Sequence, residues 1–220
     1  YAGKQQSTIL QLIGRHLLKC YLSGEPTDGI DVSELRDALS QPNAELHQLA
    51  KLIYKSDGIS IAYAELLNKA DRPILKEVRR NTAKGERVYI QFIYERFLEY
   101  ILSQAFIEMH SSPQPGHFID ALKATEASVV WIGALRNALI DTCISADNFD
   151  IFIQLHNNWG DDYNVMSLLN DFIGALISEN YENQLFRLLK LLISGSQTDN
   201  ALIEQFNQVV KTIESNQADD

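Results

Sequence analysis

Hydrophobic and polar positions follow a helical spacing over most of this chain. Apolar residues recur every three or four positions from Ser7 to Ser23, and similar spacing predicts shorter helices after Ser33, over Ala44–Lys55 and over Ile61–Lys69. Small polar residues often cap the first turn of a helix, so we expect Ser33 and Asn43 to be N-caps. The first third of the chain is therefore predicted to form one long helix followed by three short ones.

Between residues 74 and 92 the pattern changes to alternation of polar and apolar positions. Ile74–Arg80 and Arg87–Phe92 both alternate, and Lys84-Gly85 lies between them. Two alternating segments around a glycine-containing connection predict a β-hairpin. A hairpin that follows three short helices is the element order of a winged helix-turn-helix.

The second strand of this hairpin leads directly into a helix. In "RVYIQFIYERFLEYILSQ", the alternation of Arg87–Phe92 gives way to a helical face with Phe97, Leu98, Ile101 and Leu102, with neither Gly nor Pro between the two. We therefore expect a direct passage from the hairpin to the helices that follow.

From Tyr94 onward the pattern is helical and is interrupted only by turn-rich segments. The predicted helices are Tyr94–Met109, His117–Lys123, Ala127–Ser145, Asn148–His156, Val165–Ser178, Gln184–Ser194 and Asn200–Glu214. The predicted fold is mainly α. It has a winged-helix-like unit with one hairpin at residues 1–93, followed by a HEAT-like stack of antiparallel helices at residues 94–220.

Charge differs between the two halves of the chain. Residues 1–110 contain 14 basic and 14 acidic side chains, whereas residues 111–220 contain 5 and 15, which gives the whole net charge of −10. The acidic second half is expected to repel nucleic acid and anionic membranes. No apolar run approaches the roughly 20 residues of a membrane span.

Cysteine usage points to a reducing compartment. Cys20 and Cys143 are far apart in the sequence and do not suggest a disulfide framework, so we expect a cytoplasmic protein. Because the chain begins at Tyr1 rather than Met, we also expect it to be a fragment or a processed chain.

The hairpin carries the strongest local charge of the chain. Its net charge of +3 comes from Lys76, Arg79, Arg80, Lys84 and Arg87 against Glu77 and Glu86. Arg79, Arg80, Lys84 and Arg87 are therefore the candidate contacts of a basic wing with phosphate or with a partner. The alternative is a solvated hairpin whose charges protect its edge from aggregation.

The sequence contains no catalytic signature. The only Gly-Lys pair, Gly3-Lys4, is followed by Gln5, so the chain has no P-loop, and it has no G-x-S-x-G motif. No two of the five histidines have the i, i+3 or i, i+4 spacing of metal ligands. We predict no catalytic, cofactor-binding or metal-binding residue and no enzymatic activity; no residue supports the remaining class, an all-α enzyme.

The segment "VYIQFIYERFLEYILSQAF" resembles a junction in the STAND-class signalling NTPases, the NACHT-like relatives of NLR proteins and bacterial anti-phage sensors. The matching positions are Phe92, Tyr94, Glu95, Arg96, Phe97, Tyr100 and Ile101. With the preceding helices and hairpin, the resemblance covers roughly residues 8–105. It implies a piece C-terminal to an ATPase core, or a relative that lacks the core. In that family the winged helix packs on the nucleotide domain and transmits its state, and the helical repeats bind a ligand or partner.

We therefore expect a non-catalytic regulatory or scaffold segment whose partner is its own NTPase domain or another protein. At the junction of Phe92, Tyr94, Glu95, Arg96 and Phe97, we hypothesise that Glu95 or Arg96 caps the helix while the other pairs nearby. The alternative function is a DNA-binding winged-helix regulator with a helical effector or dimerisation domain. It is the weaker case, because the predicted recognition helix carries only two lysines, Lys51 and Lys55, and one glutamate.

Overall fold

The computed structural model describes residues 2–68, 73–83, 85–126, 128–146, 148–179 and 181–195. Internal contacts divide the chain into two units, Tyr1–Phe172 and Ile173–Asp220. The described residues are mainly helical with a small antiparallel sheet, as predicted. The predicted boundary between residues 93 and 94 lies inside the first unit and stays a prediction.

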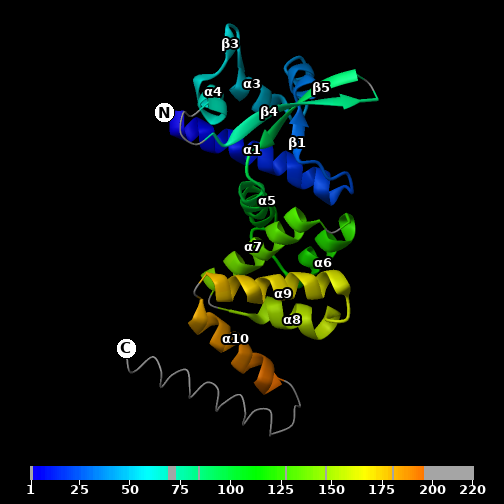
Figure 1. Cartoon of the computed structure of the whole chain (residues 1–220), viewed down its shortest axis with the longest axis vertical. Helices are drawn as coiled ribbons and strands as arrows, with labels where there is room; N and C mark the ends of the chain where they lie inside the picture. The colour runs from blue at the N-terminus through cyan, green and yellow to red at the C-terminus, as the bar shows by residue number, and fades with distance from the viewer. Residues whose placement is uncertain are drawn as a thin grey trace. The chain divides into compact units, whose positions relative to one another are not determined.

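The N-terminal elements of the first unit include the predicted helices and hairpin (Figure 1). They are α1 (Ala2–Leu22), β1 (Gly29–Asp31), α2 (Val32–Ala38), α3 (His47–Ile53), β2 (Tyr54–Lys55), β3 (Gly58–Ile59), α4 (Ile61–Asn68), β4 (Leu75–Thr82) and β5 (Gly85–Phe92). The sequence did not predict β1 or the β2–β3 pair. These strands have only two or three residues, too few to show an alternation.

Both predicted N-caps are wrong. The N-cap of α2 is Asp31, whose carboxylate accepts a hydrogen bond from the backbone N–H of Ser33 at 2.8 Å. The N-cap of α3 is Leu46, which makes no side-chain cap. Asn43 lies in the turns that precede the helix, where the N–H of Ala44 bonds the carbonyl of Gln41 at 2.8 Å. The backbone therefore forms separate turns here, and α3 begins three residues later than predicted.

The three-stranded sheet has the order β1-β5-β4, with every pair antiparallel. In its register Ile30 lies opposite Ile90 and Leu75 lies opposite Phe92, and all four side chains are buried. The central strand is thus the one that continues toward the helices, and β4 forms the outer edge of the hairpin.

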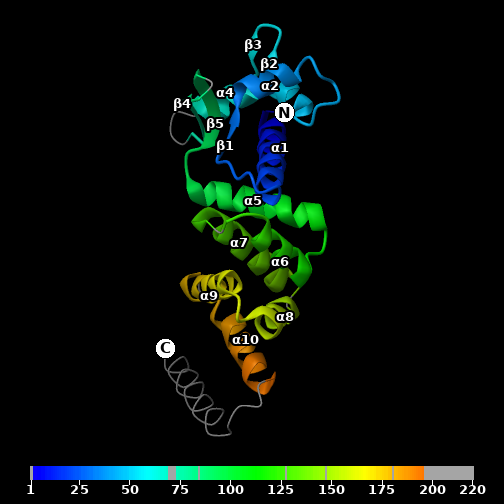
Figure 2. The same cartoon turned by 90° about the vertical axis from the view of Figure 1, so that its right-hand side faces the viewer.

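Helix α1 lies at the centre of the first unit (Figure 2). Its apolar stripe of Ile9, Ile13 and Leu17 is almost completely buried, and it packs against α3, α4 and α5. At the crossing with α5, a Cβ atom on Gly14 would lie 2.4 Å from Cγ2 of Ile101 and 3.1 Å from its carbonyl oxygen. The two helices approach this closely because position 14 carries no side chain.

The remaining described helices agree with the predicted helical segments, with ends shifted by a few residues. They are α5 (Glu95–His110), α6 (Pro115–Ala124), α7 (Val129–Ser145), α8 (Asp150–Trp159), α9 (Tyr163–Ser178) and α10 (Glu182–Gly195). The predicted helix Asn200–Glu214 lies outside the described residues. Within the first unit α7 packs on both α5 and α8. No helix in the described part of the chain has the length and apolar character needed to cross a bilayer.

An ion pair between charged side chains is buried between α5 and α7. Nη2 of Arg136 donates to Oε2 of Glu99 at 3.0 Å, and the two side chains are 14% and 8% exposed. A Cβ atom on Gly133 would lie 2.5 Å from the carboxyl carbon of Glu99, so this glycine leaves the space that the carboxylate occupies. Oδ1 of Asn137 accepts a second hydrogen bond from Arg136 at 2.9 Å.

Candidate functional site

The hairpin presents one apolar and one polar face, because successive side chains of a strand point to opposite sides. The apolar face is buried at Leu75, Ile90 and Phe92. On the polar face the register places Arg80 opposite Arg87. Two of the predicted wing residues therefore lie on one face of the sheet, the face that also carries Asp31 on β1.

Arg87 is held by a carboxylate of the neighbouring strand. Its Nη1 forms an ion pair with Oδ2 of Asp31, whose Oδ1 accepts hydrogen bonds from the Ser33 backbone at 2.8 Å and hydroxyl at 2.6 Å. Burial by itself would raise the pKa of Asp31, but the hydrogen bonds from Ser33 and Arg87 outweigh burial and lower it. Asp31 is therefore ionised at neutral pH and joins β5 to the start of α2.

Arg80 also pairs with a residue next to β1. Its Nη2 donates to Oδ2 of Asp28 at 2.8 Å, and its guanidinium lies 5.3 Å from the centre of the Tyr89 ring. Arg80 and Arg87 thus bind the two acidic residues on either side of Gly29-Ile30, and they fasten the hairpin to β1.

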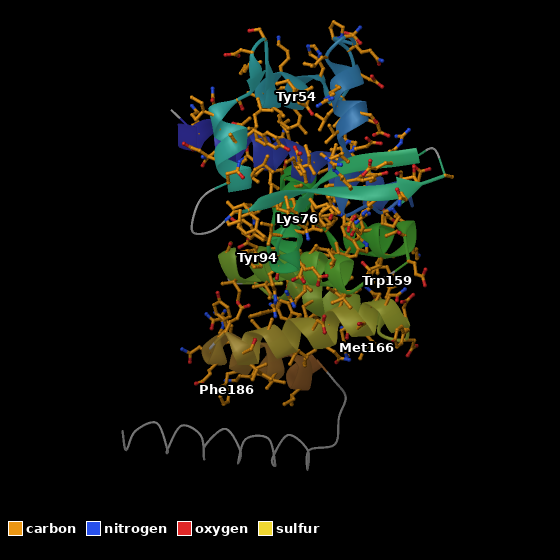
Figure 3. All side chains as sticks on the ribbon, turned by 45° about the horizontal axis from the view of Figure 1, so that its top comes forward. Tyr54, Lys76, Tyr94, Trp159, Met166 and Phe186 are labelled. Carbon is orange, nitrogen blue, oxygen red and sulfur yellow. The ribbon has the colours of Figure 1, made fainter. Side chains whose placement is uncertain are left out.

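Arg79 lies on the opposite face near the tip of the hairpin, where its Nη1 is 3.7 Å from Oε1 of Glu86 and both side chains are largely exposed. Lys84, the fourth predicted wing contact, lies outside the described residues. The three described arginines face three carboxylates, so their formal charges sum to zero. Lys76, exposed on β4, makes no ion pair with any residue that the structure describes (Figure 3).

The strand-to-helix junction is held by aromatic packing. β5 ends at Phe92 and α5 begins at Glu95, with Tyr94 as an extended N-cap residue between them (Figure 3). The rings of Phe92 and Phe97 lie 5.9 Å apart, and Phe97 lies 6.3 Å from Tyr100 in an edge-on arrangement. Ring pairs at these separations have favourable contact energies.

The expected polar contacts of Glu95 and Arg96 are not seen. The N-cap of α5 is Tyr94, whose side chain does not cap the helix. Glu95 lies in the first helical turn, where its negative charge interacts favourably with the helix dipole. Within the described parts of the chain, neither Glu95 nor Arg96 forms a hydrogen bond or ion pair, and both side chains are exposed.

A buried amide near the junction also escaped the sequence analysis. Gln91 is 6% exposed, lies opposite Gly29, and its Nε2 has no hydrogen-bond partner among the described residues. A donor left without a partner in this way reduces stability by about 1–3 kcal/mol. Gln91 lies on the same face of β5 as Arg87 and Tyr89, so this polar face is buried at its end beside β1.

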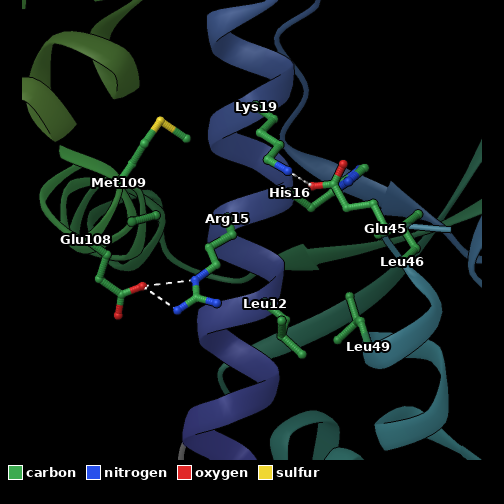
Figure 4. Close-up of a pocket in the computed structure, with 10 residues that line it drawn as sticks. Leu12, Arg15, His16, Lys19, Glu45, Leu46, Leu49, Glu108 and Met109 are labelled. Atoms are coloured by element: carbon green, nitrogen blue, oxygen red, sulfur yellow. Dashed lines mark hydrogen bonds and ion pairs between the residues drawn. The ribbon is translucent and has the colours of Figure 1, made fainter. Parts of the chain in front are cut away.

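A groove of about 370 Å³ runs along α1 between α3 and α5 (Figure 4). Its floor is formed by residues of α1 spaced as one helical face: Leu12, Arg15, His16 and Lys19. Its walls are Leu46 and Leu49 on the α3 side and Ala105, Glu108 and Met109 on the α5 side. This groove was not predicted from the sequence, because it is formed by residues of three helical segments that only the fold brings together.

Two ion pairs flank the floor of this groove. Nη2 of Arg15 lies 2.9 Å from Oε2 of Glu108, and Nζ of Lys19 lies 2.7 Å from Oε1 of Glu45 (Figure 4). In each pair both side chains are between 39% and 55% exposed, so the pairs are solvated. Burial lowers the pKa of His16 although Glu45 opposes that shift, so this imidazole is neutral at pH 7.

A second hollow of about 330 Å³ adjoins the groove and shares His16, Glu45 and Leu46 with it. It adds Glu34 and Asp37 from the exposed side of α2. Neither carboxylate forms a hydrogen bond or ion pair with a residue in the described ranges. The groove with Arg15, Lys19, Glu45 and Glu108 is formally neutral, and the adjoining carboxylates make the combined surface negative.

The remaining candidate chemistry is sparse. The rings of His110 and His117 are stacked with their centres 4.0 Å apart, and the N–H of Gln114 donates to Nδ1 of His117 at 3.1 Å. No group of three metal-ligand side chains converges among the described residues. Both cysteines are free, and burial raises the pKa of Cys143 to about 12. Burial also raises the pKa of Cys20, so both thiols are mainly protonated at neutral pH.

Comparison of the chain with family models, with curated proteins and with solved structures finds no match.

Proposed function

We propose that the chain is a non-catalytic regulatory and scaffold segment that works through interdomain or protein–protein contacts. In this proposal residues 1–93 form a winged-helix-like unit and residues 94–220 a HEAT-like helical stack, within a larger NTPase of the STAND class. A cytoplasmic setting belongs to the same proposal and agrees with the free thiols of Cys20 and Cys143.

The topology of the small sheet supports the winged-helix part of the proposal. The strand β1 stands between the first two helices, and it pairs with β5, the second strand of the hairpin. Arg80 and Arg87 fasten the hairpin to this strand region through Asp28 and Asp31. The arginines therefore hold the wing in place. A partner could contact only those atoms of the two guanidinium groups that remain exposed.

The passage from β5 to α5 is the observation that carries the functional proposal. Only two residues separate the strand from the helix, and Phe92 on the strand packs on Phe97 in the first helical turns. A displacement of the hairpin would therefore move the start of α5, which packs on α1 and α7. Such a connection suits a segment that transmits a change from one neighbour to another.

Consecutive helices support the repeat-like part of the proposal. Within the first unit, α5 packs on α7, α6 packs on α8, and α7 packs on α8. Contacts of this kind join each helix to its near neighbours in sequence, as in stacked helical repeats.

The proposal is tested by joining the chain to the coding sequence that precedes it in its open reading frame. A P-loop domain is expected there, and addition of ATP should change amide hydrogen exchange in the first turns of α5. A Phe97→Leu variant should reduce that change while keeping the fold, and Tyr163→Leu, an exposed aromatic residue on α9 away from the junction, is the control.

Two results would contradict the proposal. One is an upstream sequence without a P-loop domain. The other is a salt-dependent shift of random duplex DNA by the chain at about 50 mM salt, which would favour the DNA-binding alternative.

A further inference from the structure

We propose that the groove on α1 binds a short amphipathic helix of a partner protein, and that the polar face of this helix carries lysine or arginine. The inference deepens the proposed function and rests on its premise that the chain works through protein contacts. It names the surface and the chemistry of the partner, neither of which the hairpin or the junction determines.

The shape of the groove fits a helix. Two helical elements, α3 and α5, pack on α1 and leave the face with Leu12 and His16 open between them (Figure 4). From Leu12 to Lys19 this floor is about 10 Å long at 1.5 Å per residue, which corresponds to two turns of a docked helix. Helix-in-groove recognition uses apolar anchors at i, i+3, i+4 and i+7 on the bound segment.

The lining of the groove supplies an apolar contact surface. Leu12 and Leu46 are partly exposed, and Met109 is 43% exposed. Burial of such side chains by a partner is favourable in proportion to the apolar area that leaves water. Methionine adapts its shape to different apolar neighbours, which suits a binding surface.

The charge of the residues that line the groove and the adjoining hollow favours a basic partner. Arg15 and Lys19 are already paired with Glu108 and Glu45, so the groove itself has two positive and two negative charges. The adjoining hollow adds two carboxylates without ion-pair partners among the described residues, Glu34 and Asp37. The combined lining has two positive and four negative charges, and the neutral His16 between the hollows leaves this balance unchanged.

The exposed ion pairs beside the groove do not close it. Surface pairs of this kind contribute little to stability, so a partner can displace them or lie against them at small cost. A lysine of the partner can therefore approach Glu34 and Asp37, and its apolar residues can reach Leu12 without a rearrangement of the fold.

The test selects helices from a display library in which every member has the same leucine face. The polar positions of each member are randomised among Lys, Glu and Gln, and the purified 220-residue chain is the target. Selected peptides are then synthesised and their dissociation constants are measured by fluorescence anisotropy. The target variants are L12Q/M109Q for the apolar lining and E34Q/D37N for the charge. The matched control is D120N/E126Q, which changes two exposed carboxylates, one on α6 and one just after it.

We expect selected helices to be rich in lysine and to bind L12Q/M109Q at least about tenfold more weakly. Binding to E34Q/D37N should be about 3- to 10-fold weaker, with D120N/E126Q unchanged. Selection of acidic or neutral helices, affinities that these variants leave unchanged, or a failure to select any binder would each overturn the proposal. Unchanged far-ultraviolet spectra and melting temperatures of the variants separate loss of binding from loss of fold.

The outcome is distinguishable from that of the proposed function. A groove that binds no helix leaves the nucleotide-dependent exchange at α5 to be measured separately. Conversely, a groove that binds basic helices in a chain with no upstream P-loop domain would keep this inference and remove its NTPase context.

Discussion

The molecule uses arginine–carboxylate pairs in two different surroundings. Between α5 and α7, Arg136 and Glu99 are almost excluded from solvent. On the hairpin, Arg79 and Arg80 pair with Glu86 and Asp28, and these side chains are between 43% and 77% exposed. The interacting groups are the same, but burial changes how much each pair contributes to the free energy of unfolding and how much stability is lost when one member is removed.

A buried pair specifies how two elements pack, because either charge left alone in the interior is strongly unfavourable. An exposed pair is screened by water, contributes little, and can be exchanged for a contact with a partner. The interface of α5 and α7 is thus suited to a fixed scaffold, and the hairpin is suited to a surface that meets other molecules.

Removal of one member of the buried pair should cause the largest loss of stability. In Arg136→Met the carboxylate of Glu99 stays buried without its cation, and we expect a loss of about 3 kcal/mol or more in the free energy of unfolding. Urea denaturation followed by circular dichroism measures this loss. The double variant Glu99→Leu/Arg136→Met should recover most of it, because no buried charge remains.

The corresponding change on the hairpin, Arg79→Met, is the control. Its ion pair is largely exposed, so the free energy of unfolding should change by less than about 0.5 kcal/mol. Equal losses in Arg136→Met and Arg79→Met would show that burial does not distinguish the two regions.

The crossing of α1 and α5 should tolerate little added volume. In Gly14→Ala the new methyl group would meet Cγ2 of Ile101 at 2.4 Å, so we expect a loss of about 1–3 kcal/mol. Gly3→Ala on the same helix is the matched control, since nothing lies within 4 Å of its added Cβ. That substitution should stabilise the helix by up to about 1 kcal/mol. Thermal unfolding of both variants measures the two effects, and a stabilised Gly14→Ala variant would contradict the close packing.

The helices and the hairpin should also lose stability in different ranges of pH. Burial and the neighbouring His117 lower the pKa of His110, although Asp120 opposes the shift. An unfolded histidine titrates near pH 6.5, so as pH falls below about 6.5 the unfolded chain binds protons first and stability decreases. Denaturation at about pH 7.5 and about pH 5 should show this fall, and His110→Gln should reduce it. A variant with an unchanged pH profile would contradict the role of His110.

The ion pair between the hairpin and Asp31 should also lose stability as the pH falls, but over a lower range of pH. The pKa of Asp31 in the folded chain lies below its ordinary value near 3.8. Its contribution to stability is therefore complete above about pH 4 and is lost as pH falls through the lowered pKa.

Local sequence patterns predicted the elements whose periodicity extends over several residues. The alternation of Ile74–Arg80 and Arg87–Phe92 predicted the hairpin, and the change of period at Tyr94 predicted the start of α5 within one residue. These patterns are local, because each strand or helix shows its own spacing whatever it packs against. The cap of α2 could not be assigned in this way, since Asp31 and Ser33 are both good N-cap residues.

Local patterns could not predict contacts between residues that are far apart in the sequence. The partners Glu99 and Arg136 are 37 positions apart, and Asp28 and Arg80 are 52 positions apart. The sequence showed basic residues on the hairpin but could not show which carboxylates the fold brings to them. For the same reason the groove on α1 was not predicted, since it exists only where α3 and α5 pack on α1.

The most local effect is expected where the hairpin is attached to β1. Arg80→Gln removes an exposed ion pair with Asp28, so global stability should fall by no more than about 1 kcal/mol. Because β1 has only three paired residues, loss of this contact should be visible as faster hydrogen exchange of Ile30, whose strand partner is Ile90. Exchange in α7 should change much less, since the buried pair of Arg136 and Glu99 still joins α7 to α5. Equal acceleration in β1 and α7 would mean that the two regions open as one unit, and the contrast between a fixed scaffold and an adaptable hairpin would then fail.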